Sequence, residues 1–479
     1  MIPSPSTAAV ASPSMTVAGR SFPASTVFDV VDPSTGKVVA NAPHCSRTQL
    51  DEVVTVAREA LPSWSRRPIE QRREFLLAMA DTIEVHAEEL AELITLEQGK
   101  PRALAAGEVG GVSYWLRQTA LLDLPETVNQ DDGTRLSVTW RAPIGVVAAL
   151  TPWNYPLGQT SFKLGPALLA GNTVVFKPSV HAPLAALRLG ELCGDVLPPG
   201  VLNVIAGEDE LGPWMTAHPG FDMISFTGST ETGKRVAENA ARSLSHVTLE
   251  LGGNDAAIVL PDVDVAEVAP RLFWAAFANS GQICLAVKRL YIHADLYEAM
   301  ARELCAIART VRMGDPTARD TELGPVSHRR QYDRVVELLR DSERQGHRFL
   351  SGGVPDGKGD GYFIRPTLID SPPDDARIVR EEQFGPVLPL LRYTDLDDAV
   401  ARANDSEYGL GASVWSRDAE AARQVAERLE AGTVWVNEIM HLDPHVPFGG
   451  LKQSGSGVES GLAGLMEFTE ARTLTVKRG

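Results

Sequence analysis

The sequence predicts an α/β protein with two doubly wound parallel sheets and a β-hairpin that projects from them. Two observations indicate this class. Short apolar strands alternate with helix-like stretches along most of the chain, which is typical of parallel sheets with helices on both faces. The chain has 479 residues, of which 44% are hydrophobic, enough for two or three domains with large cores.

A helix is expected first, over residues 68–99, because apolar side chains recur there at spacings of three and four. Pro68 suits its start and Gly99 suits its end. His86 falls on the apolar face and is interpreted as a packed side chain. The face comprises Phe75, Leu76, Met79, Ile83, His86, Leu90 and Leu93.

An alternating strand follows at residues 134–140. Its apolar residues alternate with polar ones, as in an antiparallel strand with one buried face. Asp132 and Gly133 form a turn signal before it, so residues 124–142 are expected to form a projecting hairpin. This strand and the C-terminal stretch 473–477 are candidates for unpaired sheet edges, which predicts a homodimer or homotetramer.

Two series of strands and helices make up most of the remaining chain. The strands of the first series are expected at residues 144–150, 173–177, 201–205, 223–226 and 247–250. The helices of this series are expected at residues 158–170, 182–194, 208–217 and 230–243. The strands of the second series are expected at residues 256–260, 289–293, 387–393, 411–415 and 433–437. Right-handed crossovers place ligand-binding loops at the carboxyl ends of such strands.

Charge and cysteine content argue against several classes of function. The net charge is −17 and no basic block is present, which argues against nucleic-acid binding. Four scattered cysteines without a C-x-x-C pair predict neither a disulfide framework nor a metal site. The first twenty residues lack a signal-peptide pattern and are expected to be flexible, and no apolar run reaches membrane-spanning length. We therefore expect a cytoplasmic protein that binds neither nucleic acid nor membrane.

Cys284 stands in the stretch FANSGQICLAVKR, between a glycine-led turn and an apolar run. Taken alone, an intracellular cysteine is usually a small buried hydrophobe. A reactive thiol needs surroundings that stabilise the thiolate. Whether Cys284 is structural or reactive therefore depends on the residues that the fold brings to it.

Four other motifs stand at the ends of predicted strands. Asn154 in LTPWNYP is either a turn residue or a donor to a developing oxyanion. Lys177 in VVFKPS is either solvated or placed to bind the ribose of a nucleotide. Glu250 in VTLELGGND is either a surface glutamate or a general base whose pKa is raised by burial. The stretch FTGSTETGK, residues 226–234, is either a simple turn or an anion site at a helix start.

Together these motifs resemble those of the aldehyde dehydrogenase superfamily. The segments PWNYP, KPS, FTGST, LELGG, GQIC, EEQFGP and PFGG–K–SG occur in this order within roughly residues 25–475. The resemblance implies a hydrolytic, NAD(P)-dependent enzyme. It also implies three parts. The cofactor-binding domain would comprise residues 1–123 and 143–251, and the catalytic domain residues 252–453. The oligomerisation element and the C-terminal segment would comprise residues 124–142 and 454–479.

The resemblance implies roles for individual residues. Cys284 would be the nucleophile and Glu250 the base that activates water, while Asn154 and the backbone N–H of Cys284 would hold the oxyanion. Lys163 and Glu459 match a proton relay behind the base. The residues implied in binding NAD or NADP are Pro152, Trp153, Lys177, Ser179, Val180, Gly207, Gly228, Ser229, Gly233, Leu251, Glu382 and Phe384.

The implied reaction oxidises an aldehyde to a carboxylic acid through a thioester on Cys284. Glu250 favours hydrolysis over transfer to coenzyme A, and the complete set of matched catalytic residues argues against a catalytically silent structural relative. The positions implied for the aldehyde tunnel are Tyr155, Gln159, Phe162, Ile283, Leu285 and Leu442.

This mixed aromatic and aliphatic wall favours an uncharged aliphatic or aromatic aldehyde. Phe162 stands where relatives that oxidise succinate semialdehyde carry an arginine. The alternatives are a semialdehyde, or an aminoaldehyde whose charge Glu438 and Asp443 would meet near the mouth.

The choice of nucleotide depends on one position in the resemblance. Many NAD-preferring relatives carry a glutamate three residues after the ribose-binding lysine, and its charge repels a 2′-phosphate. That position is Val180 here. We therefore expect NAD to work and NADP to be tolerated.

Overall fold

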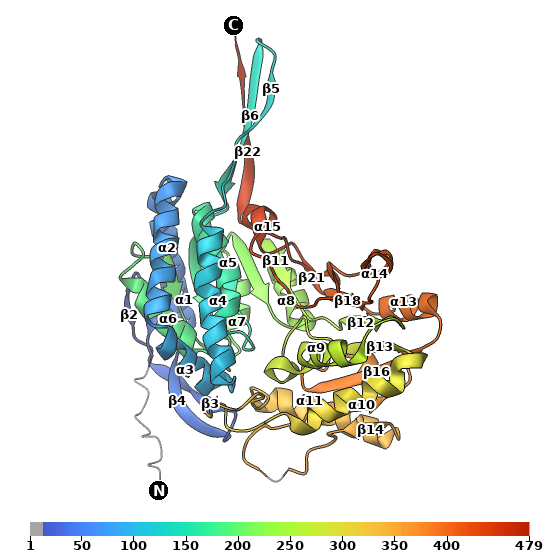
Figure 1. Ribbon diagram of the computed structural model, residues 1–479. Helices are drawn as coiled ribbons and strands as arrows, with labels where there is room; N and C mark the ends of the chain where they lie inside the picture. Colours follow the sequence, from blue (N-terminus) through green and yellow to red (C-terminus); the bar gives the residue numbers. More distant parts are fainter. Residues whose placement is uncertain (1–12, 358, 479) are drawn as a thin grey trace.

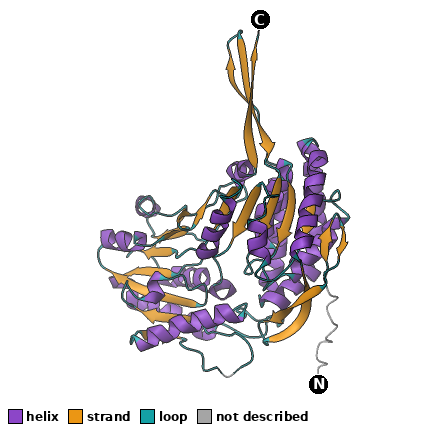
Figure 2. Ribbon diagram, turned by 180° about the vertical axis from the view of Figure 1, so that it is seen from behind, coloured by secondary structure: helices purple, strands orange, loops and turns teal. Residues whose placement is uncertain are grey.

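The computed structural model describes residues 13–357 and 359–478. Two large sheets with helices packed on them form the body, and a narrow β arm projects from it (Figures 1 and 2). The expected α/β class with a projecting hairpin is confirmed.

The first sheet has eight strands in the order β2-β1-β9-β8-β7-β10-β11-β21. Its central five strands are parallel, and the edge strands β1, β2 and β21 pair antiparallel. The strands are β1 (Met15–Val17), β2 (Arg20–Phe22), β7 (Val146–Leu150), β8 (Thr173–Lys177), β9 (Leu202–Val204), β10 (Met223–Thr227), β11 (His246–Glu250) and β21 (Gly455–Ser456). The helices of this part of the chain are α1 (Arg47–Ser65), α2 (Ile69–Val85), α3 (Ala87–Gln98), α4 (Arg102–Thr119), α5 (Gly158–Ala170), α6 (Leu184–Gly194), α7 (Leu211–Thr216) and α8 (Thr230–Ala240).

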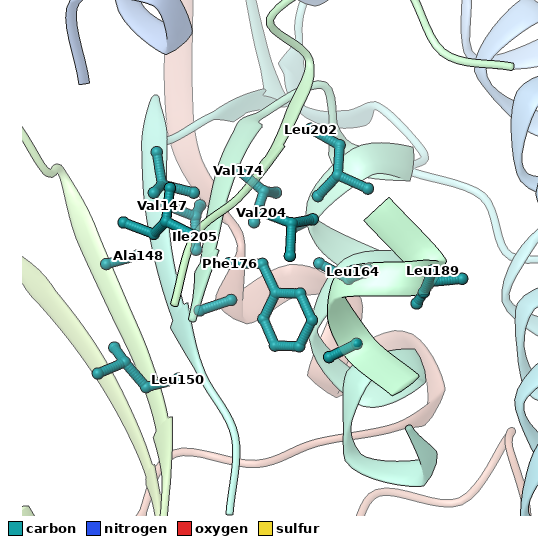
Figure 3. Close-up of a cluster of buried hydrophobic side chains, with 14 of the residues drawn as sticks. Val147, Ala148, Leu150, Leu164, Val174, Phe176, Leu189, Leu202, Val204 and Ile205 are labelled. Carbon is teal, nitrogen blue, oxygen red and sulfur yellow. The ribbon is translucent and has the colours of Figure 1, made fainter. Parts of the chain in front are cut away.

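The central strands of this sheet are apolar because helices cover them. Every residue of β7 and β8 is buried, as expected for a parallel sheet enclosed on both faces. Figure 3 shows Phe176 of β8 among the side chains of Leu164 of α5 and Leu189 of α6. The parallel arrangement brings the carboxyl ends of β7, β8, β10 and β11 to one edge, where Asn154 and Glu250 stand.

The second sheet has seven strands in the order β14-β15-β16-β13-β12-β18-β19, and only β14 pairs antiparallel within it. All five strands expected in the second series are present. The strands are β12 (Ala256–Val259), β13 (Arg289–His293), β14 (Arg348–Ser351), β15 (Thr367–Asp370), β16 (Val387–Tyr393), β18 (Gly411–Trp415) and β19 (Thr433–Val436). The helices are α9 (Val265–Phe277), α10 (Ala294–Thr310), α11 (Arg329–Arg344), α12 (Arg377–Arg380), α13 (Leu396–Asn404) and α14 (Ala419–Ala426). The last helix, α15 (Gly461–Glu467), packs on α5 of the first part instead.

The arm has three strands rather than two (Figure 1). β5 (Thr127–Asp131) and β6 (Arg135–Pro143) form the expected hairpin, and β22 (Thr469–Lys477) pairs with β6 of the same chain along its whole length. The expectation that the strand at residues 134–140 is an unpaired edge is therefore wrong, because β6 is the central strand of the arm. Two smaller pairs complete the fold, namely β3 (Thr26–Asp32) with β4 (Lys37–His44) and β17 (Tyr408–Gly409) with β20 (Leu451–Lys452).

The single helix expected over residues 68–99 is wrong, because α2 and α3 meet at His86. His86 has φ −105° and ψ 19°, and two glutamates in the first turn of α3 favour a helix start there. Its ring is not packed in the core, since Nδ1 lies 3.0 Å from the carboxylate of Glu89 at the surface. Pro68 precedes α2 and Gly99 follows α3 with φ 82°, as expected.

The N-terminal region also differs from the expectation of a flexible stretch over residues 1–20. Residues 1–12 lie outside the described residues, but Met15–Val17 form the buried strand β1, which pairs with β2 and β9. Over residues 13–357 and 359–478, none of the helices combines the length and apolar character that a bilayer crossing requires.

Candidate active site

Cys284 follows a turn with an unusual backbone conformation. After α9 the chain reverses through Asn279, Ser280 and Gly281, whose φ angles are 50°, 55° and 73°. A Cβ atom on Gly281 would lie 2.2 Å from the carbonyl oxygen of Gly385, so only glycine fits there. The turn therefore packs directly against the loop that precedes β16 and presents Cys284 just beyond it.

Two cavities meet at Cys284. The first, here called the Glu382 cavity, has a volume of about 210 Å³, and the second, the Phe162 cavity, has a volume of about 400 Å³. Both are lined by Gln159, Thr227, Leu251 and Cys284. A thiol at this junction can contact ligands that enter from either side.

The Glu382 cavity collects seven of the residues predicted to bind the cofactor. Within it, the Glu382 carboxylate accepts a hydrogen bond from the Gly253 N–H at 3.0 Å. The rings of Trp153 and Phe384 meet edge to face with centroids 5.3 Å apart. The seven residues are Pro152, Trp153, Gly228, Ser229, Leu251, Glu382 and Phe384.

The start of α8 borders the same cavity. The Gly228 N–H donates to the Glu250 carbonyl at 3.0 Å, and Ser229 caps α8 by accepting from the Thr232 N–H at 3.3 Å. A Cβ atom on Gly228 would lie 2.4 Å from the ring of Phe226, so the loop needs glycine there. Backbone N–H groups at such a helix start suit a diphosphate.

Three of the remaining predicted cofactor residues lie beyond this cavity. Lys177 is 9% exposed, its Nζ donates to the Pro178 carbonyl, and burial lowers its pKa to about 8. The Ser179 Oγ accepts from the His181 N–H. Val180 lines a separate cavity of about 700 Å³, here called the Val180 cavity.

Gly207 and Gly233 line neither the Glu382 cavity nor the Val180 cavity. A Cβ atom on Gly207 would lie 2.7 Å from the side chain of Leu211, and one on Gly233 would lie 2.4 Å from the side chain of Leu251. The structure therefore gives both glycines a role in close packing, and Gly233 supports Leu251, which does line the Glu382 cavity.

The Val180 cavity brings together charged residues that no motif predicted. Arg329 and Arg330, from α11, line it with Val180. The rings of His181 and His328 stack there with centroids 3.8 Å apart. The arginines come from an element about 150 residues away in the sequence, so the segment around Val180 gave no sign of them.

The Phe162 cavity is lined by all six residues predicted for the aldehyde tunnel, namely Tyr155, Gln159, Phe162, Ile283, Leu285 and Leu442. Trp115, whose ring meets that of Phe162 edge to face at 5.0 Å, and Met440 and Phe448 extend the apolar wall. Among the residues that the structure describes, no lysine or arginine lines this cavity.

The two acids expected near the mouth do not reach the Phe162 cavity. Glu438 is exposed and lies 3.7 Å from Arg271. The carboxylate of Asp443 accepts from the His445 N–H. Neither position offers a carboxylate to a cationic group inside the cavity.

Glu250, at the end of β11, is 4% exposed and lines the Phe162 cavity. Burial raises its pKa, and the neighbouring charge of Glu459 raises it further, while Lys163 opposes this. The Lys163 Nζ lies 2.8 Å from the Glu459 carboxylate and donates to the Ser225 Oγ at 3.2 Å. Glu459 and Lys163 thus connect the cavity at Glu250 with the buried Ser225.

Asn154 is 3% exposed, and its Nδ2 donates to the carbonyl of Gln282 at 2.9 Å. An amide nitrogen carries two hydrogens, so one remains for a ligand at Cys284. The backbone carbonyl of Asn154 accepts from the Nζ of Lys100 at 2.9 Å and from the Nδ2 of Asn279 at 3.2 Å. These contacts fix the backbone of Asn154, and the bond to Gln282 orients its side-chain amide.

The support of Asn154 by Lys100 is a feature that the motifs missed. Lys100 forms a fully buried ion pair with Glu108, whose other carboxylate oxygen accepts from the N–H groups of Leu157 and Gly158 at 2.9 Å each. The ammonium of Lys100 also lies 3.6 Å from the ring centroid of Tyr155. Lys100 lies in the loop between α3 and α4, and Glu108 lies in α4, so no single helix pattern marked the pair.

The surroundings of Cys284 disfavour ionisation of its thiol. Burial raises its pKa to about 12, Lys288 lowers it, and Glu250, Asp255 and Glu382 raise it. Ionisation of the thiol therefore requires a nearby base, a nearby cation or a bound ligand.

The partly exposed thiol of Cys284, at the junction of two cavities and between two enclosed sheets, is a candidate nucleophile. The chain belongs to the aldehyde dehydrogenase family, whose model matches residues 21–474.

Individual relatives agree along nearly the whole length. The phenylacetaldehyde dehydrogenase of Pseudomonas fluorescens is 39% identical over 464 residues, covering 94% of this chain and 92% of the relative. A crystal structure of an NAD-dependent aldehyde dehydrogenase from Sinorhizobium meliloti has a TM-score of 0.95 at 35% identity, covering 99% and 96% of the two chains. A betaine aldehyde dehydrogenase from Staphylococcus aureus in complex with NAD⁺ has a TM-score of 0.94 at 32% identity, covering 97% and 95%.

Proposed function

We propose that the protein oxidises an uncharged aliphatic or aromatic aldehyde to a carboxylic acid, with NAD as the hydride acceptor. The observation that carries this proposal is the position of Cys284 at the junction of the Glu382 and Phe162 cavities. One cavity has the groups that a dinucleotide needs, and the other has an apolar wall and a buried carboxylate.

The residues of the Glu382 cavity fit NAD. The start of α8 offers N–H groups to a diphosphate, and the carboxylate of Glu382 can accept from ribose hydroxyls. Lys177 is a buried cation at the end of β8, close to where an adenosine ribose would lie. When bound, NAD supplies the acceptor for the hydride that leaves the aldehyde carbon.

In the first stage, the Cys284 thiolate adds to the aldehyde carbon and the carbonyl oxygen becomes an alkoxide. The second N–H of the Asn154 side-chain amide and the backbone N–H of Cys284 would donate to this oxygen. One such donor lowers a barrier by about 3–4 kcal/mol. As the alkoxide collapses to a carbonyl group, the hydride leaves the former aldehyde carbon for the acceptor that NAD would supply, and a thioester remains on Cys284.

In the second stage, Glu250 removes a proton from a water that attacks the thioester carbon. The raised pKa of Glu250 makes its carboxylate a stronger base than a solvated one. Glu459 and Lys163 lie behind it and can carry the proton away from the cavity. A base poised in this way favours hydrolysis over transfer to coenzyme A.

The wall of the Phe162 cavity supports the substrate class. Aromatic and aliphatic side chains line it, and the carboxylate of Glu108 is neutralised by Lys100. A semialdehyde carboxylate would find no cation among the described lining residues, and an aminoaldehyde would find neither Glu438 nor Asp443. The name of the Pseudomonas relative, which specifies phenylacetaldehyde, agrees with an arylalkyl substrate.

NADP is proposed as a tolerated second cofactor. Val180 carries no charge to repel a 2′-phosphate, and Arg329 and Arg330 line the cavity that Val180 lines. The acids Asp29, Glu208 and Asp333 line it too, and Asp333 is paired with Arg329. Asp209 lies near Lys177, whose pKa it raises, so some negative charge opposes the phosphate. A modest preference for NAD follows from this balance.

The arm supports a proposal of a homodimer or homotetramer. Its edge strands β5 and β22 expose apolar side chains, with Val128 61%, Leu474 55% and Val476 42% exposed. A three-stranded arm that projects from the body gains stability when another subunit covers it.

We also propose the division into domains that the resemblance implies. For the location we propose the cytoplasm, where the four free cysteines stay reduced.

A panel of aldehydes tests the function. The purified protein with NAD is assayed for NADH formation with phenylacetaldehyde, benzaldehyde, hexanal, succinate semialdehyde and an aminoaldehyde. We expect the highest kcat/KM among the three uncharged aldehydes. Higher kcat/KM for either charged substrate would contradict the substrate class, and no NADH with any aldehyde would contradict the function.

A further inference from the structure

Lys288 is a buried lysine that the reaction scheme above does not use. Its side chain is buried, with 2% exposed. It lies four residues after Cys284 and directly before β13. Its own N–H and that of Arg289 donate to the carbonyl of Asp255, so the backbone at this point is fixed. The side chain turns back toward the loop that carries the thiol.

The ammonium of Lys288 donates hydrogen bonds to several backbone carbonyls of that loop. Nζ donates to the carbonyl of Cys284 at 2.6 Å, to that of Ile283 at 3.1 Å and to that of Ala286 at 3.4 Å. An ammonium has three hydrogens to donate, and these three carbonyls share them with the carboxylate of Glu382. The backbone from Ile283 to Ala286 is therefore held around one cation.

The contact with the Ile283 carbonyl has a consequence on the other side of the same peptide. A trans peptide is planar, and its C=O and N–H point in opposite directions. When the Ile283 carbonyl points at Lys288, the N–H of Cys284 must point away from it. That N–H is the second donor proposed for the oxyanion, and Lys288 fixes its direction.

The charge of Lys288 also matters to the thiol. Among the described charged groups that shift the pKa of Cys284, Lys288 lowers it and the carboxylates of Glu250, Asp255 and Glu382 raise it. Lys288 thus opposes three acids, whereas Arg334, which lines the Glu382 cavity with Cys284, is paired with Glu381. Lys288 also lies 3.5 Å from the Glu382 carboxylate, which links the thiol loop to the nucleotide side of the site.

We propose that Lys288 is a positioning residue for Cys284, which orients the backbone N–H of the nucleophile and holds a positive charge beside its sulfur. The proposal rests on the proposed function only in treating Cys284 as the nucleophile. It predicts that loss of the charge slows thiolate formation and that a charge-retaining replacement restores it in part.

Alkylation of Cys284 by iodoacetamide measures the thiolate directly and needs neither aldehyde nor NAD. Rate constants are measured from pH 6 to pH 10 for the wild type, Lys288→Met, Lys288→Gln and Lys288→Arg, with peptide mapping to identify the alkylated cysteine. Lys288→Gln keeps two donors without the charge and protects the measurement against a folding defect in Lys288→Met. Circular dichroism and thermal melting establish that each variant is folded.

Lys452→Met is the matched control. The Nζ of Lys452 also donates to two backbone carbonyls, those of Asn404 and Ser406, and lies 2.7 Å from Glu430. It is exposed and does not face the thiol. Its loss removes the same charge and the same kind of contacts elsewhere in the chain.

We expect the neutral variants to react at least about tenfold more slowly at pH 7.5, with the rise of the rate displaced to higher pH, since each pKa unit changes the thiolate fraction tenfold. Lys288→Arg is expected to lie between them and the wild type, and Lys452→Met to match the wild type. Neutral variants that fold and keep the wild-type pH profile would overturn the proposal.

The same samples are assayed for aldehyde oxidation. A wild type that forms no NADH would contradict the proposed function while leaving the comparison of alkylation rates valid. Conversely, an active wild type with unchanged alkylation in the neutral variants would contradict only the role of Lys288.

Discussion

The Glu382 and Phe162 cavities share Cys284 but are built in different ways. Loops at the ends of strands form most of the first, and it offers backbone N–H donors and a carboxylate. Side chains from α4, α5 and the loop after β19 form most of the second, and its character comes from their shapes. We infer that the chemistry depends on short motifs at fixed places, whereas substrate choice depends on packing between distant elements.

The largest effect is expected at the junction of the two cavities. Cys284→Ala removes the nucleophile and should lower kcat by at least about 10⁴-fold, since loss of a catalytic nucleophile costs up to about 10⁶-fold. Equilibrium binding of NAD, which uses the Glu382 cavity, should persist. The matched control is Cys305→Ala, because Cys305 is buried away from both cavities. Wild-type turnover by Cys284→Ala would remove the assignment.

A smaller effect is expected from the donor beside the thiol. Asn154→Ala should lower kcat by about 10²–10³-fold, the usual loss for one oxyanion donor, with little change in KM for an apolar aldehyde. Steady-state kinetics with phenylacetaldehyde measures both constants. A loss below about tenfold would mean that the Asn154 amide does not contact the oxygen.

The charges of Glu459 and Lys163 should set the pH at which Glu250 becomes active as a base. Glu250 acts as a base only when ionised, so deacylation should rise with pH through its pKa. Glu459 raises that pKa and Lys163 lowers it. In pre-steady-state assays, Glu459→Gln should move the rise to lower pH and Lys163→Met to higher pH. Shifts in the same direction for both variants would contradict the charge assignment.

The smallest effect concerns the nucleotide side. Val180→Glu should lower kcat/KM for NADP relative to NAD by about 5–150-fold, which corresponds to about 1–3 kcal/mol for one charge contact. Kinetics with both cofactors measures it, with Val180→Gln as the matched uncharged control. Equal losses for NAD and NADP would place the 2′-phosphate away from Val180.

The difference between the cavities explains what the sequence could predict. Glu250, Gly228 and Glu382 stand in short motifs at the ends of strands or in loops, so their order along the chain was enough to bring them together. The six tunnel residues also line one cavity, because Tyr155, Gln159 and Phe162 lie on or beside α5 and Ile283 and Leu285 flank the thiol.

Contacts between distant elements could not be predicted in this way. Arg330 reaches the Val180 cavity from α11, and Trp115 reaches the Phe162 cavity from α4, with no motif to mark either residue. The break at His86 was missed because the apolar period continues across it in register. The pairing of β22 with β6 joins strands more than 300 residues apart, which periodicity alone does not determine.

The central claim is that Cys284 carries the acyl group and Glu250 activates the water that removes it. Its most direct test is whether the acyl group stays on Cys284 when Glu250 cannot act as a base. Glu250→Gln is mixed with phenylacetaldehyde and NAD, quenched in acid, and analysed by intact and peptide mass spectrometry. We expect a burst of NADH close to one equivalent per active site and an acyl adduct that accumulates on Cys284. A variant that turns over at the wild-type rate without a detectable adduct, or an adduct on another residue, would contradict the central claim.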